Sequence, residues 1–431
     1  MGISHHRRHI VDSWLTPRST TLTHRNRVRK LCPSRILLAL TLLPIILWLP
    51  PLAFGAQTLD QAIQAQLDLD CLGLTGGGSA AGLSAELNSI CAGGNSSGPG
   101  ASAGGATGSA QSLGATVENR RQDRLEGKQT GNQVTFNLPS GLGLFISGDV
   151  EALDRDRTTF GDGFDSTVLG VTIGGDFQFN DRLIAGAAFN YINRDGDFDG
   201  GGDFSTNSYG VLTYGSFMPI PSIFLDVAVG YTRHNYLVER PVSYVEAGSG
   251  VTIGGRSSSN SNGNEFNIRA VAGYDHSVGN ITVGPRIGIN YSRTKIDNYT
   301  EDGGGGLALS YDDQTIHSFQ TTVGLQGSIT INTSYGVWVP QATADYIHEF
   351  DNDRRSITVQ FEGDNRTAAQ GGISKFSFNN DKPDRDFFNF SVGTILILPN
   401  GIQPFVNFRI MAGNDQFDNY GGTFGVRIEG N

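Results

Sequence analysis

The stretch Ser222-Ile-Phe-Leu-Asp-Val-Ala-Val-Gly-Tyr-Thr-Arg233 decides the fold of this chain. Its large apolar side chains recur at every second residue: Ile223, Leu225, Val227, Val229 and Tyr231. The positions between them hold Phe224, Asp226, Ala228, Gly230 and Thr232. Because successive side chains of a strand leave opposite faces, this alternation predicts a β-strand with one apolar face and one face of mostly small or polar residues.

The same alternation returns in about twelve runs between residue 141 and the C-terminus, for example over residues 280–292 and 318–332. Each run is about 10–14 residues long, which exceeds the usual soluble strand and suits a tilted membrane crossing. A large soluble antiparallel sheet with one wet face is the alternative. The second face is rich in glycine and small residues, which does not resemble a simple solvated exterior.

The connections between these runs alternate in length. Tight turns are expected at residues 180–181, 219–221, 279–280, 333–334 and 399–400. Long polar connections are expected near residues 154–165, 195–204, 239–264, 297–312, 351–385 and 413–417. Short periplasmic turns and long outer loops are the rule for outer-membrane barrels. The sequence therefore predicts an all-β protein, a 12-stranded antiparallel transmembrane β-barrel over residues 135–431 with no exposed edge strand.

Residues 1–55 have the order of a signal peptide, in which basic residues precede an apolar run at 36–49 and a small-residue exit at Ala53-Phe-Gly-Ala56. Cleavage after Gly55 and cleavage after Ala56 both fit. A retained anchor helix is the alternative, and Pro50 and Pro51 count against it. The chain has a net charge of −11, and loss of the basic leader makes it more acidic. This balance argues against a nucleic-acid partner.

A small helical segment is expected over residues 56–92, where Thr58 and Gln61 fit a capping box. Cys71 and Cys91 are predicted to form a disulfide, since the periplasm is oxidising. Residues 93–110 are rich in glycine, serine and alanine, which is typical of a flexible linker. They include a G-x-S-x-G match around Ser96, but the strand and helix that a nucleophile elbow needs are not expected there.

Residues 111–130 are predicted to form a charged helix that carries Arg120, Arg121 and Arg124. Such a helix either lies in solvent or threads the polar lumen of the barrel, and we favour the lumen. Its arginines would then find carboxylate partners on the inward faces of the strands. The expected partners are Asp149, Glu151, Asp226 and Asp345.

A possible calcium loop begins at Asp195. The residues at positions 1, 3, 5 and 9 of an EF-hand loop would be Asp195, Asp197, Asp199 and Asp203. Position 12 would be Thr206, where a bidentate glutamate is wanted, and the flanking segments read as strands. We therefore expect a solvated outer loop, bridged to lipopolysaccharide by divalent ions, and no resident metal or cofactor.

Three motifs carry a resemblance to a known family. They are the run 141–151, the runs 336–340 and 346–350, and the stretch Asp384-Arg-Asp-Phe-Phe388. Together with the leader, linker, charged helix and strands, residues 112–431 resemble an autotransporter of the type V secretion class. The resemblance implies a translocator that is inserted by the barrel-assembly machinery and carries its own N-terminal passenger, here residues 56–92. The passenger is short where family passengers are usually long, and the chain ends in Asn431 where barrel proteins tend to end in an aromatic residue.

The expected function is that of a monomeric outer-membrane translocator that moves its own short N-terminal segment to the cell surface. A surface interaction protein, acting through the loops at 239–264 and 351–385, and a plugged pore are the alternatives. We do not expect an enzyme, because the histidines of the barrel lie on separate strands and no nucleophile–base set can be assembled from the sequence. These histidines are His234, His276, His317 and His348.

Overall fold

The computed structural model describes residues 94–96, 138–158, 160–246, 252–366 and 375–430. The expected signal peptide, the helical segment with Cys71 and Cys91, and the helix with Arg120, Arg121 and Arg124 lie outside these residues. Within the described ranges, no helix has the length and apolar character needed to cross a membrane.

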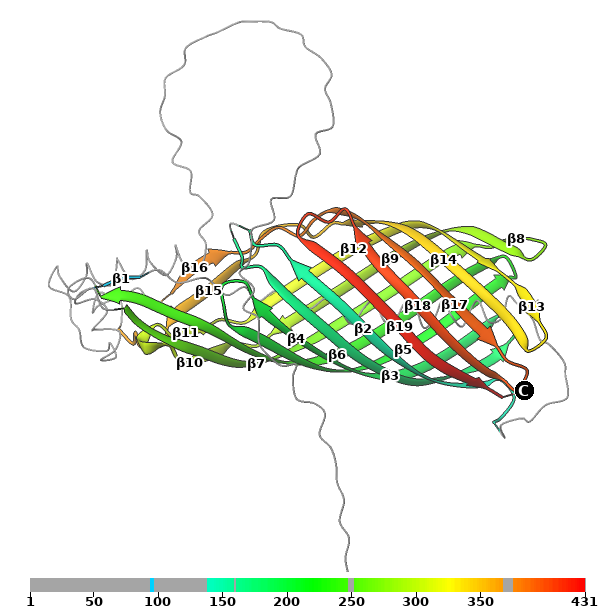
Figure 1. Cartoon of the computed structure of the whole chain (residues 1–431), viewed down its shortest axis with the longest axis horizontal. Helices are drawn as coiled ribbons and strands as arrows, with labels where there is room; N and C mark the ends of the chain where they lie inside the picture. Colours follow the sequence, from blue (N-terminus) through cyan, green and yellow to red (C-terminus); the bar gives the residue numbers. More distant parts are fainter. Residues whose placement is uncertain (1–93, 97–137, 159, 247–251, 367–374, 431) are drawn as a thin grey trace, which may run out of the picture. The chain divides into compact units, whose positions relative to one another are not determined.

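Twelve antiparallel strands close into a barrel, as predicted (Figure 1). In chain order they are β2 (Leu142–Arg155), β3 (Phe164–Asn180), β4 (Leu183–Phe198), β5 (Asp203–Ile220), β6 (Ile223–Glu246), β7 (Thr252–Tyr274), β9 (Ile281–Ile296), β12 (Gln314–Ile329), β14 (Gly336–Glu349), β17 (Asp386–Ile397), β18 (Ile402–Ala412) and β19 (Phe417–Glu429). The short strands β8 (His276–Val278) and β13 (Ile331–Thr333) lie at two tight turns. Pairing of β19 with β2, from Phe417↔Arg155 to Glu429↔Gly143, closes the ring.

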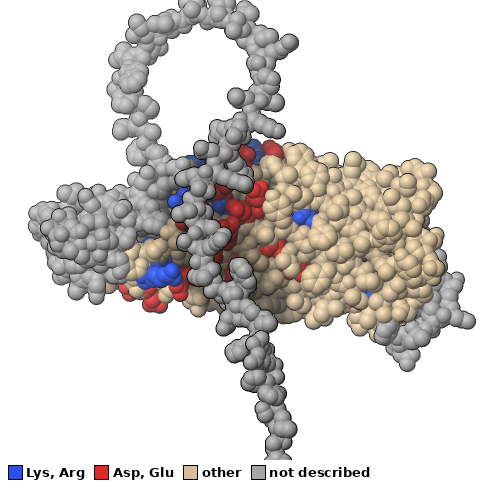
Figure 2. All heavy atoms as spheres, in the orientation of Figure 1, with Lys and Arg blue, Asp and Glu red and all other residues tan. Residues whose placement is uncertain are grey.

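The two faces of each strand separate as the alternation predicted. On β2, Leu144, Ile146 and Val150 are exposed, whereas Phe145, Ser147 and Glu151 between them are buried. On β12, Leu325 is 63% exposed and its neighbour Gln326 only 5%. The side of the barrel is almost free of charge on the face that Figure 2 shows, and charged side chains gather toward one end. This apolar belt is the surface that a membrane barrel presents to lipid.

Glycine makes room for large side chains inside the barrel. A Cβ added at Gly174 would lie 2.5 Å from Cζ of Phe145 and 2.5 Å from Cβ of Ala188. Phe145 and Ala188 pack with Leu212, Tyr214 and Ala228 in an inward apolar cluster. Glycine at this position of β3 therefore allows an aromatic ring on a face that is otherwise polar.

The ends of the barrel differ, as predicted. Tight turns join β3 to β4 and β5 to β6, and at the other end long segments join β9 to β12 and β14 to β17. We call the end with the long connections the outer end. The prediction that these connections are plain loops is wrong. The segment expected at 239–264 largely continues β6 and β7, and the loop expected at 195–204 shrinks to residues 199–202.

The long outer connections fold into a second sheet. Its strands are β10 (Tyr299–Gly303), β11 (Leu309–Tyr311), β15 (Ser356–Phe361) and β16 (Phe376–Asn379), with a 3-10 turn η1 (Gly304–Gly306) after β10. We call these four strands the outer sheet. They pair in the order β7, β10, β11, β15, β16. The sheet has its own core, formed by Val242, Leu307, Leu309, Tyr311, Ile357, Val359, Phe361 and Phe378. Strands of three to six residues are too short for their periodicity to be recognised in the sequence.

Three residues of the expected linker also form a strand. β1 (Gly94–Ser96) pairs antiparallel with the outer end of β6, from Gly94↔Glu246 to Ser96↔Tyr244. This pairing places residues 94–96 at the outer end of the barrel.

Candidate functional site

The inward face of the barrel wall is the candidate functional site, because it joins buried charged groups from strands that are not neighbours. Near the periplasmic turns, Arg427 on β19 donates two hydrogen bonds of 2.7 Å to the carboxylate of Asp176 on β3. The hydroxyl of Tyr214 donates a third, of 2.8 Å, to the same carboxylate. The side chains of Asp176 and Arg427 are 0% and 7% exposed. Fully satisfied carboxylates of this kind fix the positions of the strands that carry them.

A second pair crosses the strand that lies between its two partners. Arg286 on β9 donates hydrogen bonds of 2.9 and 2.5 Å to Asp345 on β14. The strand between them is β12, on which Gly324 lies directly opposite both residues. A Cβ at Gly324 would lie 1.9 Å from Oδ1 of Asp345. Because Gly324 has no side chain, the charged groups of Arg286 and Asp345 can meet across β12.

The same arrangement recurs on the other side of the barrel. Arg409 on β18 donates a 2.7 Å hydrogen bond to Glu151 on β2, and Gly421 of β19 lies opposite both. Arg427 likewise passes over Gly143 of β2, where a Cβ would lie 1.7 Å from its Nη2 atom. Three arginine–carboxylate pairs thus use a glycine on the strand between them. This pattern can be read from a sequence once the strand register is known.

The expected partners of the charged helix, Asp226 included, are all on the inward face of the wall. Glu151 and Asp345 are held by Arg409 and Arg286, and the hydroxyl of Thr423 donates a 2.7 Å hydrogen bond to Asp149. Asp226 is buried, at 7% exposure. The sequence interpretation left out the arginines of the wall itself, although Arg286 and Arg427 occupy predicted inward positions.

A polar cluster lies closer to the outer end. Oγ of Ser208 lies 2.8 Å from Nδ1 of His234, and Nε2 of His234 lies 3.4 Å from Oε2 of Glu265. The structure thus assembles a serine–histidine–glutamate set that the sequence did not reveal. Ser208 lies in the middle of β5, where both of its neighbours are paired with β4 and β6. Backbone N–H groups used in such ladders are not free to form an oxyanion hole beside Ser208.

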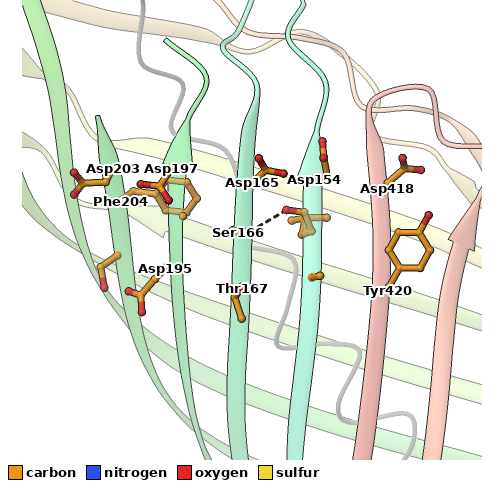
Figure 3. A pocket seen from close by; sticks show the side chains of 14 residues that line it. Asp154, Asp165, Ser166, Thr167, Asp195, Asp197, Asp203, Phe204, Asp418 and Tyr420 are labelled. Carbon is orange, nitrogen blue, oxygen red and sulfur yellow. Dashed lines mark hydrogen bonds between the residues drawn. The ribbon is translucent and has the colours of Figure 1, made fainter. Parts of the chain in front are cut away.

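A row of carboxylates runs around the outside of the outer end. Asp154 lies opposite both Asp418 and Asp165, and Asp197 lies opposite both Asp165 and Asp203. Figure 3 shows these side chains on adjacent strands around an open pocket. Asp195 and Asp197 are in β4 and Asp203 begins β5, so the expectation of a loop there is wrong for these three residues. Among the described residues, no group of three or more histidine, cysteine, aspartate or glutamate side chains is arranged to hold a metal ion.

This row makes the folding stability of the barrel depend on pH. Asp154 lies beyond Val150, the last large apolar residue on the outside of β2. Partial burial, a hydrogen bond with Asp165 and the charges of its acidic neighbours raise the pKa of Asp154 to about 6. A raised pKa in the folded state contributes stability below about pH 4, the ordinary value for aspartate, and this contribution is lost as the pH rises through about 6.

We therefore expect the urea midpoint of barrel unfolding in lipid vesicles to be lower at pH 8 than at pH 5, and Asp154→Asn to reduce this difference. Asp181→Asn, in an exposed periplasmic turn, is the matched control and should keep the pH dependence of the parent. Unfolding followed by heat-modifiable gel mobility at both pH values measures the effect. The same pH dependence in Asp154→Asn and in the parent would show that the row does not cause it.

Comparison with known proteins adds a family and a fold. The family model "Autotransporter beta-domain" matches residues 144–409. Among solved structures, the translocator domain of the autotransporter NalP from Neisseria meningitidis is similar, with a TM-score of 0.52 and 15% identity over 74% of this chain and 97% of that one. Esterase EstA of Pseudomonas aeruginosa is 25% identical over 228 residues, which are 50% of this chain and 32% of that protein. An uncharacterised protein from the trpE-trpG intergenic region of Pseudomonas putida is 28% identical over 195 residues, 44% of this chain and 31% of that protein. The chain thus spans about a third of the length of these two relatives.

Proposed function

The chain belongs to the autotransporter β-domain family, and we propose that its barrel moves the chain's own short N-terminal segment across the outer membrane to the cell surface. The resemblance expected from the sequence is thereby confirmed. Autotransporter β-domains are outer-membrane barrels that translocate a passenger, and the exposed apolar belt agrees with that location. The proposal adds the identity of the passenger, residues 56–92, and its final place outside the cell.

One observation carries the proposal. β1 is paired at the outer end of β6, whereas the backbone of Gly141 and Leu142 is hydrogen-bonded to that of Gly430 beside the periplasmic turns. We infer from this that the chain between residues 97 and 137 connects the outer side to the periplasmic side. This stretch carries Arg120, Arg121 and Arg124 among other charged residues, and such a segment is too costly to place in lipid. We infer that it passes through the lumen, with the expected helix at 111–130 inside the barrel.

The chemistry of the wall suits this task. The inward acids Glu151 and Asp345 already have arginine partners in the wall, so a passing chain meets partly neutralised carboxylates and many amide and hydroxyl groups. Contacts of this kind exchange with water at little net cost. We therefore propose that the arginines of the helix add to existing ion pairs, which allows a polar segment to move along the wall without strong trapping.

An epitope tag inserted after Gln57 tests the proposal in intact cells. We expect an added antibody to label the tag and an added protease to remove it, because the segment lies outside. A tag in the turn at Asp181, in the same protein, should be labelled only after the outer membrane is permeabilised, and a tag at Gly201 should be labelled without permeabilisation. If the tag at Gln57 is reached only in permeabilised cells, the passenger remains in the periplasm and the proposal is wrong.

We further propose the remaining features that the sequence predicted. They are a Cys71–Cys91 disulfide in the passenger, cleavage of the leader after Gly55 or Ala56, insertion by the barrel-assembly machinery, and a monomeric barrel. Lipopolysaccharide is the proposed outer-leaflet partner, since the aspartate row lies at the outer edge of the apolar belt. No cofactor is proposed.

A further inference from the structure

The outer sheet extends across the mouth of the barrel. One edge is fixed to β7, where Glu301↔Ser259 and Gly303↔Ser257 pair β10 with the wall. From there the strands follow in the order β11, β15 and β16, and residues 380–385 then lead into β17. We call residues 380–385 the strap. In Figure 1, β10 and β11 lie at the lower edge of the outer end, and β16 lies at its upper edge.

The strap contacts the end of β2 and the connection that follows it. Oδ2 of Asp381 accepts a 2.5 Å hydrogen bond from Nη2 of Arg155 and a 2.6 Å hydrogen bond from Oγ1 of Thr158. Arg155 is the last residue of β2 and continues its inward series Glu151 and Leu153, so Asp381 meets it from the lumen side. In the ring order β2, β3, β4, β5, β6, β7, the strands β2 and β7 are nearly opposite each other. The sheet and the strap therefore connect opposite sides of the mouth.

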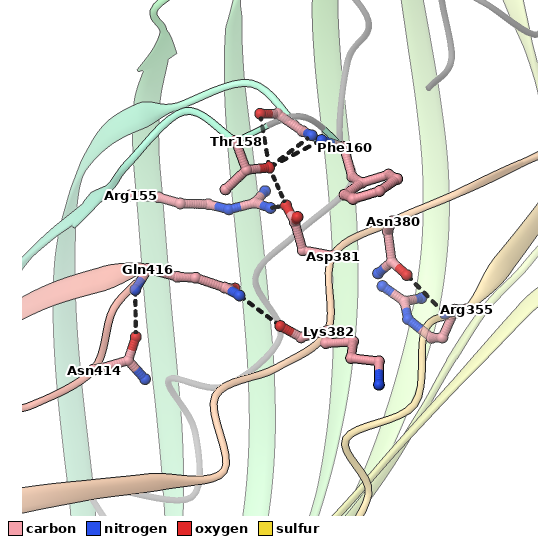
Figure 4. Close-up of polar contacts among 10 residues, drawn as sticks. Arg155, Thr158, Phe160, Arg355, Asn380, Asp381, Lys382, Asn414 and Gln416 are labelled. Atoms are coloured by element: carbon pink, nitrogen blue, oxygen red, sulfur yellow. Dashed lines mark hydrogen bonds and ion pairs between the residues drawn. The ribbon is translucent and has the colours of Figure 1, made fainter. Parts of the chain in front are cut away.

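Further contacts hold the strap along the rim, and Figure 4 shows those of Asn380 and Lys382. The side chain of Gln416 donates a 2.6 Å hydrogen bond to the carbonyl of Lys382, and the backbone N–H of Asp415 donates to Asp384. The Asn380 side chain accepts a 2.8 Å hydrogen bond from the N–H of Arg355. Beside the strap, the guanidinium of Arg354, which precedes β15, lies 3.8 Å from the ring centre of Phe160. These contacts come from three connections that are distant in the sequence.

Different interactions hold the outer sheet on the β7 side of the mouth and the strap on the β2 side. On the β7 side, a continuous backbone ladder, the apolar core and the buried Arg240–Glu301 pair fix the outer sheet. On the β2 side, the strap is held mainly by side-chain hydrogen bonds, of which the Arg155–Asp381 pair is buried, with exposures of 6% and 10%. The contacts on the β2 side are therefore expected to break before those on the β7 side.

We propose that the outer sheet and the strap form a lid, hinged on β7 and latched on β2 by Asp381, which closes the outer mouth of the barrel. Under the closed lid, inward apolar side chains of Leu153, Phe164 and Phe198, with Phe417 beside them, line the mouth on the latch side. The Arg155 guanidinium lies 5.7 Å from the ring centre of Phe417, so the latch rests on this apolar surface. The lid goes beyond the proposed translocation, because it controls access to the lumen whatever the passenger is.

Access to a cysteine beneath the lid tests the proposal in the full chain. Ser166→Cys places a thiol on the inward face of β3, where the serine is 7% exposed. Intact cells are treated with a membrane-impermeant polyethylene-glycol maleimide, and labelling is followed by the shift on a gel. We expect slow labelling with the latch intact and labelling at least about tenfold faster after Asp381→Ala, because the strap is released. The chain without Ser166→Cys gives the background from its own cysteines.

A matched control separates latch release from a general loosening of the outer sheet. Asp312→Ala removes an ion pair of 2.7 Å to Lys375, which is exposed on the outer sheet. This variant should label at the parent rate, and Asp381→Asn should fall between the parent and Asp381→Ala. Heat-modifiable mobility shows that each barrel is folded. Rapid labelling in the parent, or equal rates in the parent and Asp381→Ala, would overturn the lid. Neither result depends on whether the tag at Gln57 reaches the surface.

Discussion

Replacing Arg427 with alanine is expected to lower the free energy of barrel unfolding by about 3–5 kcal/mol, the usual cost of removing one partner of a buried ion pair. Arg427 makes both 2.7 Å hydrogen bonds to Asp176, whose side chain is 0% exposed, so the variant leaves a carboxylate without its countercharge. This contact joins β19 to β3 across β2. Its loss therefore weakens the pairing of β19 with β2, which closes the barrel and which we call the seam. Urea unfolding in lipid vesicles, followed by heat-modifiable mobility, measures the change.

Two variants test the physical reason for this effect. Lys295→Ala removes an exposed ion pair of 3.3 Å with Asp313 and should change the unfolding free energy by less than about 1 kcal/mol. The double variant Arg427→Met with Asp176→Leu removes both charges and should recover most of the loss, since no charge stays buried alone. A loss in Arg427→Ala no larger than that in Lys295→Ala would show that the pair does not stabilise the seam.

The barrel could be predicted from the sequence because its signal is repeated and long. Period-2 alternation over more than ten residues fixes which face is apolar, and it placed Asp226 and Asp345 inside the barrel. The contacts of the wall could not be predicted in the same way. Arg286 and Asp345 are 59 residues apart and meet only because β12 lies between them with Gly324 at the crossing. Register between strands sets such pairs, and register is not visible in one strand.

The outer sheet escaped the sequence interpretation for a different reason. Its strands are short, and glycine, asparagine and aspartate surround them, which is the composition of loops. In strands this short, the alternation of apolar and polar residues gives only two or three inward side chains per strand, such as those of Leu309 and Tyr311 on β11. These residues become a core only when β15 and β16 supply Ile357 and Phe378 from another connection. Because the core of the outer sheet is assembled from several connections, no single stretch of sequence shows its apolar pattern.

Replacing Glu301 with alanine is expected to unfold the outer sheet while the barrel stays folded. Glu301 accepts two hydrogen bonds of 2.7 Å from Arg240, and further ones from the Ser257 hydroxyl and the Leu309 N–H. Without the carboxylate, Arg240 is left with a buried charge, at a cost of about 3–5 kcal/mol. That cost exceeds what a small apolar core is expected to hold in reserve. Surface protease should then cut between residues 299 and 361 in intact cells, and heat-modifiable mobility should be unchanged.

The choice of controls follows from the surroundings of Glu301. Burial, together with the nearby Glu301 carboxylate, raises the pKa of Tyr311, so its hydroxyl remains a donor to Glu301 at 3.4 Å. Glu301→Gln keeps acceptor capacity but loses the charge, and it should give partial cleavage. Asp302→Ala removes the adjacent exposed acid and should leave the sheet resistant. Resistance in Glu301→Ala would mean that the apolar core alone holds the sheet. Cleavage together with loss of heat-modifiable mobility would mean that the sheet and the barrel fold as one unit. The outer sheet would then have no folding stability of its own on the hinge side of the lid.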